Sequence, residues 1–275
     1  MLRSTILSER SGLRIPDRAK LSGTAKPQGM NKFGDTVDPD DIDRFAAQAS
    51  SWWDPRGSFR PLHQINPVRL DFVRSESLAH FRGEPRSLSP FAGLSLADIG
   101  CGGGLIAEPM ARLGFAVTGI DADAQAIGVA RAHAAATGLT IDYRVADVEM
   151  LAGEGERFDA VLALEIVEHV ADRDRFLAAL ARLVKPGGIF IGATLNRTAR
   201  AFAMAIIGAE YALRWLPPGT HDWSRFVRPS EFSLPLRRAG LATTRLAGMS
   251  YTLRGGEWRI SDDLSVNYML VAVRR

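Results

Sequence analysis

Between residues 95 and 194 the chain alternates short apolar runs with longer segments in which apolar residues recur at helical spacing. Short apolar runs bounded by turn residues are typical of buried strands, and apolar residues at every third or fourth position are typical of helices. The pattern predicts strands at 95–99, 116–120, 141–145, 158–164 and 189–194, and helices at 107–113, 124–137 and 170–183. Because strands that alternate with helices pair in a parallel sheet, we expect a doubly wound α/β fold.

The flanking segments extend this prediction in both directions. Toward the C-terminus a helix at 229–238 precedes strands at 242–253 and 265–273, which gives a mostly parallel, seven-stranded sheet. Toward the N-terminus the acidic residues from Asp38 onward favour a helix start, and Ile42, Phe45 and Ala49 continue at helical spacing. We therefore expect an N-terminal helical lid and a single domain over residues 36–275.

Residues 1–35 show no sustained periodicity and mix Arg and Lys with Ser, Gly, Pro and Thr. This composition favours a flexible tail. Two alternatives stay open at this point. One is an organelle targeting segment, although Glu9 and Asp17 interrupt its basic pattern, and the other is a misassigned start upstream of Met30.

Length, charge and cysteine content exclude several classes of protein for this chain. With 275 residues the chain is long enough to bury a sizeable core, and its net charge of +3 demands no nucleic-acid partner. The single cysteine, Cys101, excludes an intramolecular disulfide and a cysteine-based zinc cluster. No apolar run approaches the roughly 20 residues that a membrane-spanning helix needs.

The first predicted strand carries Asp98 near its end and runs into a glycine-rich turn, formed by Gly100, Gly102, Gly103 and Gly104. Glycine allows a sharp turn and a close approach to a ligand, and the helix that follows offers free amide groups. The dinucleotide fingerprint fits poorly, because Leu105 stands where its third glycine belongs. A tight turn with a purely structural role is the alternative.

Ligands of doubly wound sheets bind outside the carboxyl ends of the strands. Asp98, Asp121, Asp147 and Leu164 all fall at such ends in the predicted fold. Asp121 is placed to receive a ribose, and Asp147 lies in a turn where such folds meet an adenine. The sequence thus predicts a nucleotide-like ligand at this edge.

The order acidic-x-Gly-x-Gly-x-Gly after a strand resembles the first motif of the S-adenosylmethionine-dependent methyltransferases of class I. The resemblance implies a Rossmann-like fold and S-adenosyl-L-methionine as cofactor. It also implies that the strand-end acid and the glycine backbone, Gly100 and Gly102 included, hold the methionine part of the cofactor, and that Asp121 holds the ribose hydroxyls.

A second polar group follows the fourth predicted strand. If a helical turn begins there, Glu165, Glu168 and His169 lie at i, i+3 and i+4 and share one face. Two carboxylates and an imidazole suit a divalent cation, magnesium or zinc, or they supply a general base. A metal would bring a phenolic oxygen into place and favour its deprotonated form. The alternative is a solvated helix start, since acids are favoured at helix N-termini.

Two further features precede the glycine turn. The adjacent indoles of Trp52 and Trp53 are costly to leave in water, so we expect them to cover either the core or a ligand. Arg69 has the planar fork that clamps a carboxylate, such as the amino-acid end of the cofactor, but an ordinary arginine on a helix surface fits its spacing equally.

A closer resemblance rests on a combination of short motifs spread over residues 38–271. Together they resemble the ubiquinone-biosynthesis O-methyltransferases. These motifs are Trp52-Trp53, Pro61-Leu62-His63, Ile65-Asn66-Pro67, Glu165 with Glu168-His169-Val170, Thr194-Leu195-Asn196-Arg197, Gly219-Thr220-His221-Asp222 and Val266-Asn267-Tyr268-Met269.

That resemblance implies methylation of hydroxyls on polyprenylated aromatic rings, at two steps of one pathway, with other enzymes of the pathway as possible partners. It places Arg69, Gly100, Asp121 and Leu164 on cofactor positions. It places Glu165, Glu168 and His169 on metal positions, and we take His169 as the catalytic residue. The alternatives are an enzyme that methylates another small molecule and a nucleotide-binding module without catalysis. Methylation of nucleic-acid bases is disfavoured by the modest charge and by the lack of an Asn-Pro-Pro-aromatic motif after the fourth strand.

Residues 197–219 form a predicted helical insertion after the fifth strand, with flanking arginines, an apolar middle, and Tyr211 and Trp215. This composition suits a helix that lies in the headgroup region of a membrane. A substrate lid or a dimer contact would use the same residues. We expect a cytoplasmic protein that associates peripherally with the inner face of the membrane, or, as the alternative, with the matrix face in a mitochondrion.

Overall fold

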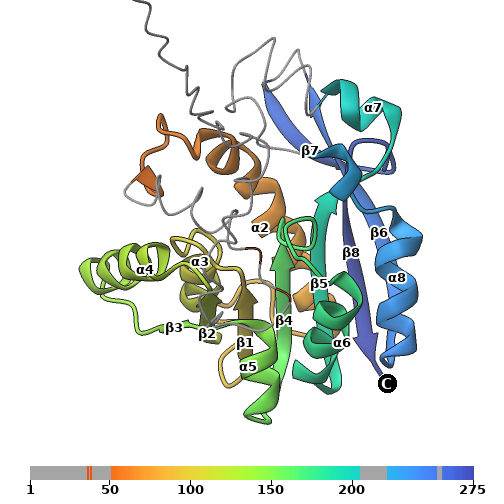
Figure 1. Ribbon diagram of the computed structural model, residues 1–275. Coiled ribbons are helices and arrows are strands. Elements are labelled where there is room, and N and C mark those ends of the chain that lie inside the picture. Colours follow the sequence, from red (N-terminus) through yellow and green to blue (C-terminus); the bar gives the residue numbers. More distant parts are fainter. Residues whose placement is uncertain (1–35, 37, 39–50, 205–221, 253–255) are drawn as a thin grey trace, which may run out of the picture. The chain divides into compact units, whose positions relative to one another are not determined.

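The computed structural model describes residues 36, 38, 51–204, 222–252 and 256–275. All of these belong to one compact unit, residues 33–275 (Figure 1). The expected tail at 1–35, most of the expected lid helix, and residues 205–219 of the expected insertion lie outside the described residues. The division into tail, single domain and insertion therefore stays a prediction.

The unit is built on a sheet of eight strands in the order β3-β2-β1-β4-β5-β8-β6-β7. Strands β1 to β5 are mutually parallel, whereas β8 runs antiparallel to both of its neighbours and β7 is antiparallel to β6. Their bounds are β1 Ser95–Ile99, β2 Ala116–Asp121, β3 Asp142–Val145, β4 Phe158–Leu164, β5 Val184–Leu195, β6 Leu241–Thr252, β7 Glu257–Ser261 and β8 Asn267–Arg274. All seven expected strands are confirmed to within a few residues.

The expected count of seven strands is wrong, because β7 adds an eighth. Residues 257–261 pair with 248–252 of β6 as a hairpin at the edge of the sheet. The segment is short and half polar, so its apolar pattern is too weak to predict a strand. The sheet is therefore mixed, with a parallel part that carries the candidate site and an antiparallel part beside it.

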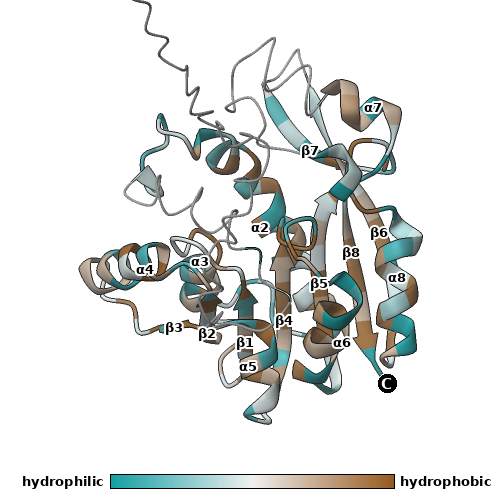
Figure 2. Cartoon of the chain, viewed as in Figure 1, coloured by the Kyte–Doolittle hydropathy of each residue, from teal (hydrophilic) through white to brown (hydrophobic). Residues whose placement is uncertain are grey.

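Helices cover both faces of this sheet, as a doubly wound fold requires (Figure 1). One core cluster combines sheet residues with α5, α6 and α8, and a second combines sheet residues with α2, α3 and α4. Successive residues of β4 point alternately into the two clusters: Val161 and Ala163 into the first, Ala160 and Leu162 into the second. Accordingly β4 and β8 are hydrophobic along most of their length (Figure 2).

The helices are α2 Arg60–Phe81, α3 Ala107–Arg112, α4 Ala124–Ala136, α5 Val148–Gly153, α6 Arg173–Leu183, α7 Ala199–Ala201 and α8 Pro229–Arg238, with a 3₁₀ turn η3 at Trp223–Arg225. The 22-residue helix α2 has no counterpart in the sequence prediction. Its two prolines explain this: Pro61 fits the first turn of a helix, but Pro67 lies in the interior, where proline disfavours helix.

Candidate active site

The glycine-rich turn lies at the carboxyl end of β1 and leads into α3, as the sequence predicts. The amides of Gly100 and Cys101 both donate to the Ile120 carbonyl of the neighbouring strand β2, at 2.8 and 3.0 Å. Gly100 and Gly102 have φ values of +73° and +52°, which side chains with a Cβ rarely adopt. Glycine is thus required by the backbone conformation here, whichever ligand approaches.

Asp121 ends β2 and fixes this turn from the side. Its Oδ2 accepts a hydrogen bond from the Gly102 amide at 2.8 Å, and its Oδ1 accepts one from the Asp123 amide at 2.9 Å. Burial raises the pKa of Asp121, while these amide donors act in the opposite direction. A carboxylate oxygen can accept two hydrogen bonds, so Asp121 keeps acceptor capacity for a hydroxyl ligand.

Asp98 lies near the end of β1 and is almost fully buried, with 3 % of its surface exposed. No group among the described residues donates to its Oδ2. Burial and the negative charge of Asp121 raise the pKa of Asp98 to about 7, and a backbone hydrogen bond from Ala107 opposes them. A buried carboxylate with one unpartnered oxygen is complementary to a cation such as the ammonium of an amino acid.

Asp147 and Leu164 also lie at this edge of the sheet. Asp147 is the N-cap of α5, where its Oδ1 accepts a hydrogen bond from the Met150 amide at 2.7 Å. This cap accounts for an acid at position 147 without any ligand. Leu164 is the last residue of β4 and is partly buried. Both positions are compatible with an adenine site, but neither residue by itself identifies one.

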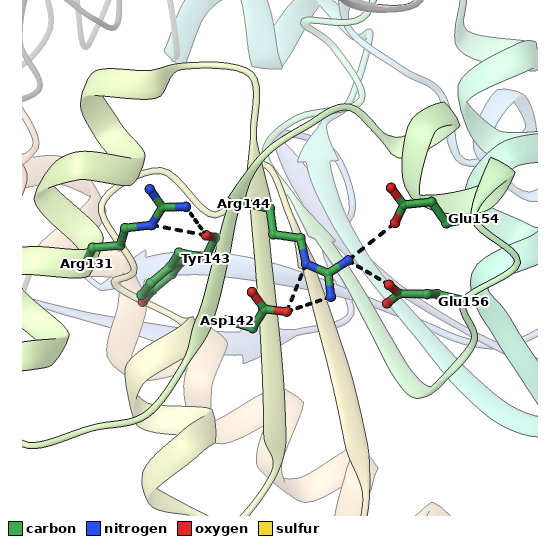
Figure 3. A network of polar contacts seen from close by, with 6 residues as sticks. All are labelled: Arg131, Asp142, Tyr143, Arg144, Glu154 and Glu156. Atoms are coloured by element: carbon green, nitrogen blue, oxygen red, sulfur yellow. Dashed lines mark hydrogen bonds and ion pairs between the residues drawn. The ribbon is translucent and has the colours of Figure 1, made fainter.

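The edge strand β3 flanks this part of the site (Figure 3). Arg131 of α4 donates to the Tyr143 carbonyl through Nε at 3.1 Å and Nη2 at 2.5 Å. Arg144 pairs with Asp142, Glu154 and Glu156 on the other side of the strand. Arg131 thus satisfies one backbone carbonyl of this edge strand, and the ion pairs of Arg144 join the strand to the segment that carries Glu154 and Glu156.

Arg69 is buried on α2, with 5 % of its surface exposed, so it is not a surface arginine. Its Nη2 lies 2.7 Å from Glu165 Oε1, and its Nη1 donates to Asn66 Oδ1 at 3.4 Å. Its Nε has no partner among the described residues. The sequence prediction missed the pairing with Glu165, because it joins segments almost a hundred residues apart in the chain.

The segment Glu165–His169 is a turn, and α6 begins only at Arg173. The expectation of a helical face shared by Glu165, Glu168 and His169 is therefore wrong. Glu165 has a φ of +54°, a left-handed conformation that breaks helical geometry after β4. Such strain in a residue other than glycine is concentrated at functional sites.

Glu168 is buried under this turn, where its Oε2 accepts a hydrogen bond from Thr194 Oγ1 at 2.9 Å. Burial, together with the charge of Glu165, raises the pKa of Glu168 to about 7, and attraction to His169 opposes this. The backbone of His169 is held from outside, since Arg225 Nη2 donates to its carbonyl at 3.0 Å and also pairs with Asp38 at 2.9 Å.

The residue types at this turn suit a divalent metal, but their arrangement does not. Glu165 is engaged by Arg69, Glu168 by Thr194, and in the described part of the chain no three His, Cys, Asp or Glu side chains gather as a metal site. The fit for S-adenosylmethionine is better, because the unpartnered oxygen of Asp98 and the unpartnered Nε of Arg69 complement an amino acid zwitterion.

Comparison with known proteins agrees with this geometry. Residues 97–192 match the family model described as "Methyltransferase domain". Among solved structures, magnesium protoporphyrin IX methyltransferase from Synechocystis PCC 6803 with bound SAH superposes with a TM-score of 0.57 at 22 % identity, over 86 % of this chain and 94 % of that one. At that identity the likeness shows the fold, which is the Rossmann-like fold of class I methyltransferases.

Curated relatives are much more similar. The chain is 54 % identical over 239 residues to the ubiquinone biosynthesis O-methyltransferase of Paramagnetospirillum magneticum, covering 87 % of this chain and 96 % of the relative. It is 50 % identical to the enzyme of the same name from Sinorhizobium fredii, with the same coverage. We conclude that the chain belongs to the ubiquinone biosynthesis O-methyltransferases, which are S-adenosylmethionine-dependent enzymes of class I.

Proposed function

We propose that this protein transfers a methyl group from S-adenosylmethionine to a phenolic hydroxyl of polyprenylated ubiquinone precursors, and that it serves both O-methylation steps. The observation that carries the site assignment is the buried, unpartnered oxygen of Asp98 at the same sheet edge as the Glu165–His169 turn. The Asp98 side chain and the Glu165–His169 turn thus belong to the same edge of the sheet, where a bound cofactor and a substrate hydroxyl can meet.

The cofactor site uses the carboxyl ends of the parallel strands. Gly100 and Gly102 offer backbone at close approach, Asp121 receives the ribose hydroxyls, and Asp147 with Leu164 borders the adenine. Asp98 pairs with the ammonium group and Arg69 with the carboxylate of the methionine part. When bound, the cofactor supplies an electrophilic methyl group.

The substrate hydroxyl must lose its proton, since a free phenol has a pKa of about 10 and is a poor nucleophile in its neutral form. We assign the base to His169, with Glu168 beside it as the anion that stabilises the protonated imidazole. Glu165 and Arg69 close the site from the α2 side as an ion pair. Activation by a magnesium or zinc ion, which the residue types of Glu165, Glu168 and His169 suggest, is the alternative that the test below separates from a base, although Arg69 and Thr194 already engage the two carboxylates.

The test is methyl transfer from labelled S-adenosylmethionine to a short-chain prenylated catechol, with and without chelator. His169→Ala should reduce the rate by about a hundredfold or more, the usual contribution of a positioned base. His80→Ala is the matched control, because His80 contacts the Gly187 carbonyl on another part of the protein. Loss of activity on chelation would favour the metal. Full activity of His169→Ala without chelator would remove His169 from the chemistry.

Membrane association through residues 197–219 is part of the proposal. In the described portion, Phe202 and Met204 are 42 % and 57 % exposed, and Phe202 contacts Trp223 edge to face at 6.3 Å. Arg200, which pairs with Asp263 at 2.8 Å, lies two residues before Phe202, and apolar side chains next to a basic residue fit the headgroup region of a membrane. We place the protein in the cytoplasm, peripherally on the inner face of the membrane, or, as the alternative, on the matrix face in a mitochondrion. Among the described residues, no helix is long and apolar enough to cross a bilayer.

Cosedimentation with anionic vesicles tests this part separately. Phe202→Asp should weaken vesicle binding, whereas Leu88→Asp should not, although Leu88 is the more exposed residue at 90 %. Leu88 precedes β1 and so lies toward the opposite end of the sheet from the ligand edge. Equal effects of the two substitutions would contradict a specific membrane surface at Phe202.

A further inference from the structure

The indole of Trp52 lies directly on the glycine-rich turn. A Cβ added to Gly103 would lie 2.5 Å from Trp52 Cγ, and one added to Gly102 would lie 2.5 Å from Trp52 Cζ2. No real side chain fits at those distances, so the turn is bare of side chains on the face that Trp52 covers. Trp52 thereby lies over the backbone that the proposed cofactor site offers to the methionine part of the cofactor.

The Nε1–H of Trp52 is a buried donor without an acceptor. The residue is only 9 % exposed, and Nε1 has no partner among the described residues. The neighbouring indole differs in this respect, because Trp53 Nε1 donates to the Gly103 carbonyl at 2.9 Å. A buried donor left unpaired costs free energy, so an acceptor at this position would be favoured.

The position of Trp52 is held by contacts that do not use its Nε1. Its ring stacks on Phe59 with centroids 3.8 Å apart, and His63 Nε2 lies 2.9 Å from its carbonyl oxygen. Trp53 stacks on His133 at 3.5 Å, and His133 contacts the buried carboxylate of Glu108 at 2.6 Å. Both tryptophans of the segment are therefore fixed by stacking, and the Trp52 donor is held in place.

An unpaired acceptor, Asp98 Oδ2, and the unpaired donor, Trp52 Nε1, thus border the same turn. The amino-acid end of S-adenosylmethionine carries one group for each: an ammonium that donates and a carboxylate that accepts. We propose that Trp52 is a cofactor-positioning residue that covers the glycine-rich turn and donates its Nε1–H to the carboxylate of the cofactor, as a second donor beside Arg69. This assignment rests on the proposed cofactor site.

The test compares two ligands that differ only in this carboxylate, S-adenosylmethionine and its decarboxylated form, by isothermal titration calorimetry. Trp52→Phe keeps an aromatic ring for stacking on Phe59 and removes the donor. Since a hydrogen bond to a charged group is at stake, we expect the variant to bind S-adenosylmethionine about tenfold more weakly and the decarboxylated ligand with unchanged affinity. Trp258→Phe is the matched control, because this indole lies on β7 beside Tyr251.

Equal weakening of both ligands by Trp52→Phe would overturn the donor assignment, since only packing would then have been lost. If the variant fails to fold, the wild-type protein with ¹⁵N-labelled indoles gives the second readout. One of the five tryptophan N–H resonances should shift with S-adenosylmethionine and not with the decarboxylated ligand; no such difference would refute the proposal. Failure of the wild type to bind either ligand would instead overturn the cofactor site itself.

Discussion

Replacing Asp98 by Asn tests the electrostatics at the centre of the site. Ionising this carboxyl in the folded protein is costly, because it loses water on burial and faces Asp121, which raises its pKa from 3.8 to about 7. Once Asp98 is ionised in both the folded and the unfolded state, this shift in its pKa lowers the free energy of unfolding by about 4 kcal/mol. The folded state holds the proton more tightly, so this penalty is absent below about pH 4, grows up to about pH 7 and is complete above it.

The variant carries no ionisable group at position 98 and escapes this penalty. Its amide adds an offset that does not depend on pH, so the pH dependence of the difference is the informative quantity. Between about pH 5 and about pH 8.5, the free energy of unfolding of Asp98→Asn should rise relative to wild type by about 3 kcal/mol. Urea denaturation of both proteins, followed by circular dichroism at each pH, measures this difference.

Asp159→Asn is the control of opposite sign. Asp159 lies at the start of β4 and pairs with Lys185 at 2.8 Å; with hydrogen bonds from Ser95 this lowers its pKa despite partial burial. Its stabilising effect is present above about pH 4 and is lost as the pH falls, so this substitution should destabilise at neutral pH. A difference between Asp98→Asn and wild type that is the same at every pH would refute the reasoning.

Three further predictions, measured by urea denaturation, test a glycine position and two ion-paired arginines around the site. Gly104→Ala should lower the free energy of unfolding by about 1–3 kcal/mol, because the φ of Gly104 is +89° and the new Cβ would overlap the Tyr143 hydroxyl. Gly128 lies within α4 and is open to solvent, so Gly128→Ala should instead stabilise the protein by up to about 1 kcal/mol. Equal effects of the two substitutions would contradict the steric argument. Arg69→Gln should cost about 1–3 kcal/mol, since it leaves the partly buried carboxylate of Glu165 without its cation, and a loss under about 1 kcal/mol would show that this pair is solvated. Arg144→Ala should cost about 1 kcal/mol at low salt and less at high salt, because its three carboxylate partners lie at the surface (Figure 3); a salt-independent loss would contradict this.

The strands of the parallel sheet were predictable because each is a local apolar run bounded by glycine, proline or polar turns. The edge strand Glu257–Ser261 was not, since its five residues are partly polar and it forms only by pairing with β6. Helix α2 was missed for a related reason. Its packing against the sheet, through Phe72 and Val73, outweighs the local cost of Pro67, and that packing is not visible in the local sequence.

The candidate site divides in the same way. The sequence by itself determined the ligand edge, because glycines that need a positive φ and acids that follow apolar strands are local signals: Asp98, Asp121 and the turn at Gly100 lie where the pattern puts them. Local spacing gave the wrong geometry for Glu165, Glu168 and His169, since a left-handed residue after β4 replaces the helical turn.

Only the tertiary structure decided which polar groups meet. It paired Arg69 with Glu165 and laid Trp52 over the turn; it also left Asp98 Oδ2 and Trp52 Nε1 without partners. The contacts of Arg69 with Glu165 and of Trp52 with the turn join segments that are far apart in the chain. The physical reason is that burial, charge pairing and unsatisfied donors depend on distance in space, whereas periodicity and turn chemistry depend on distance along the chain.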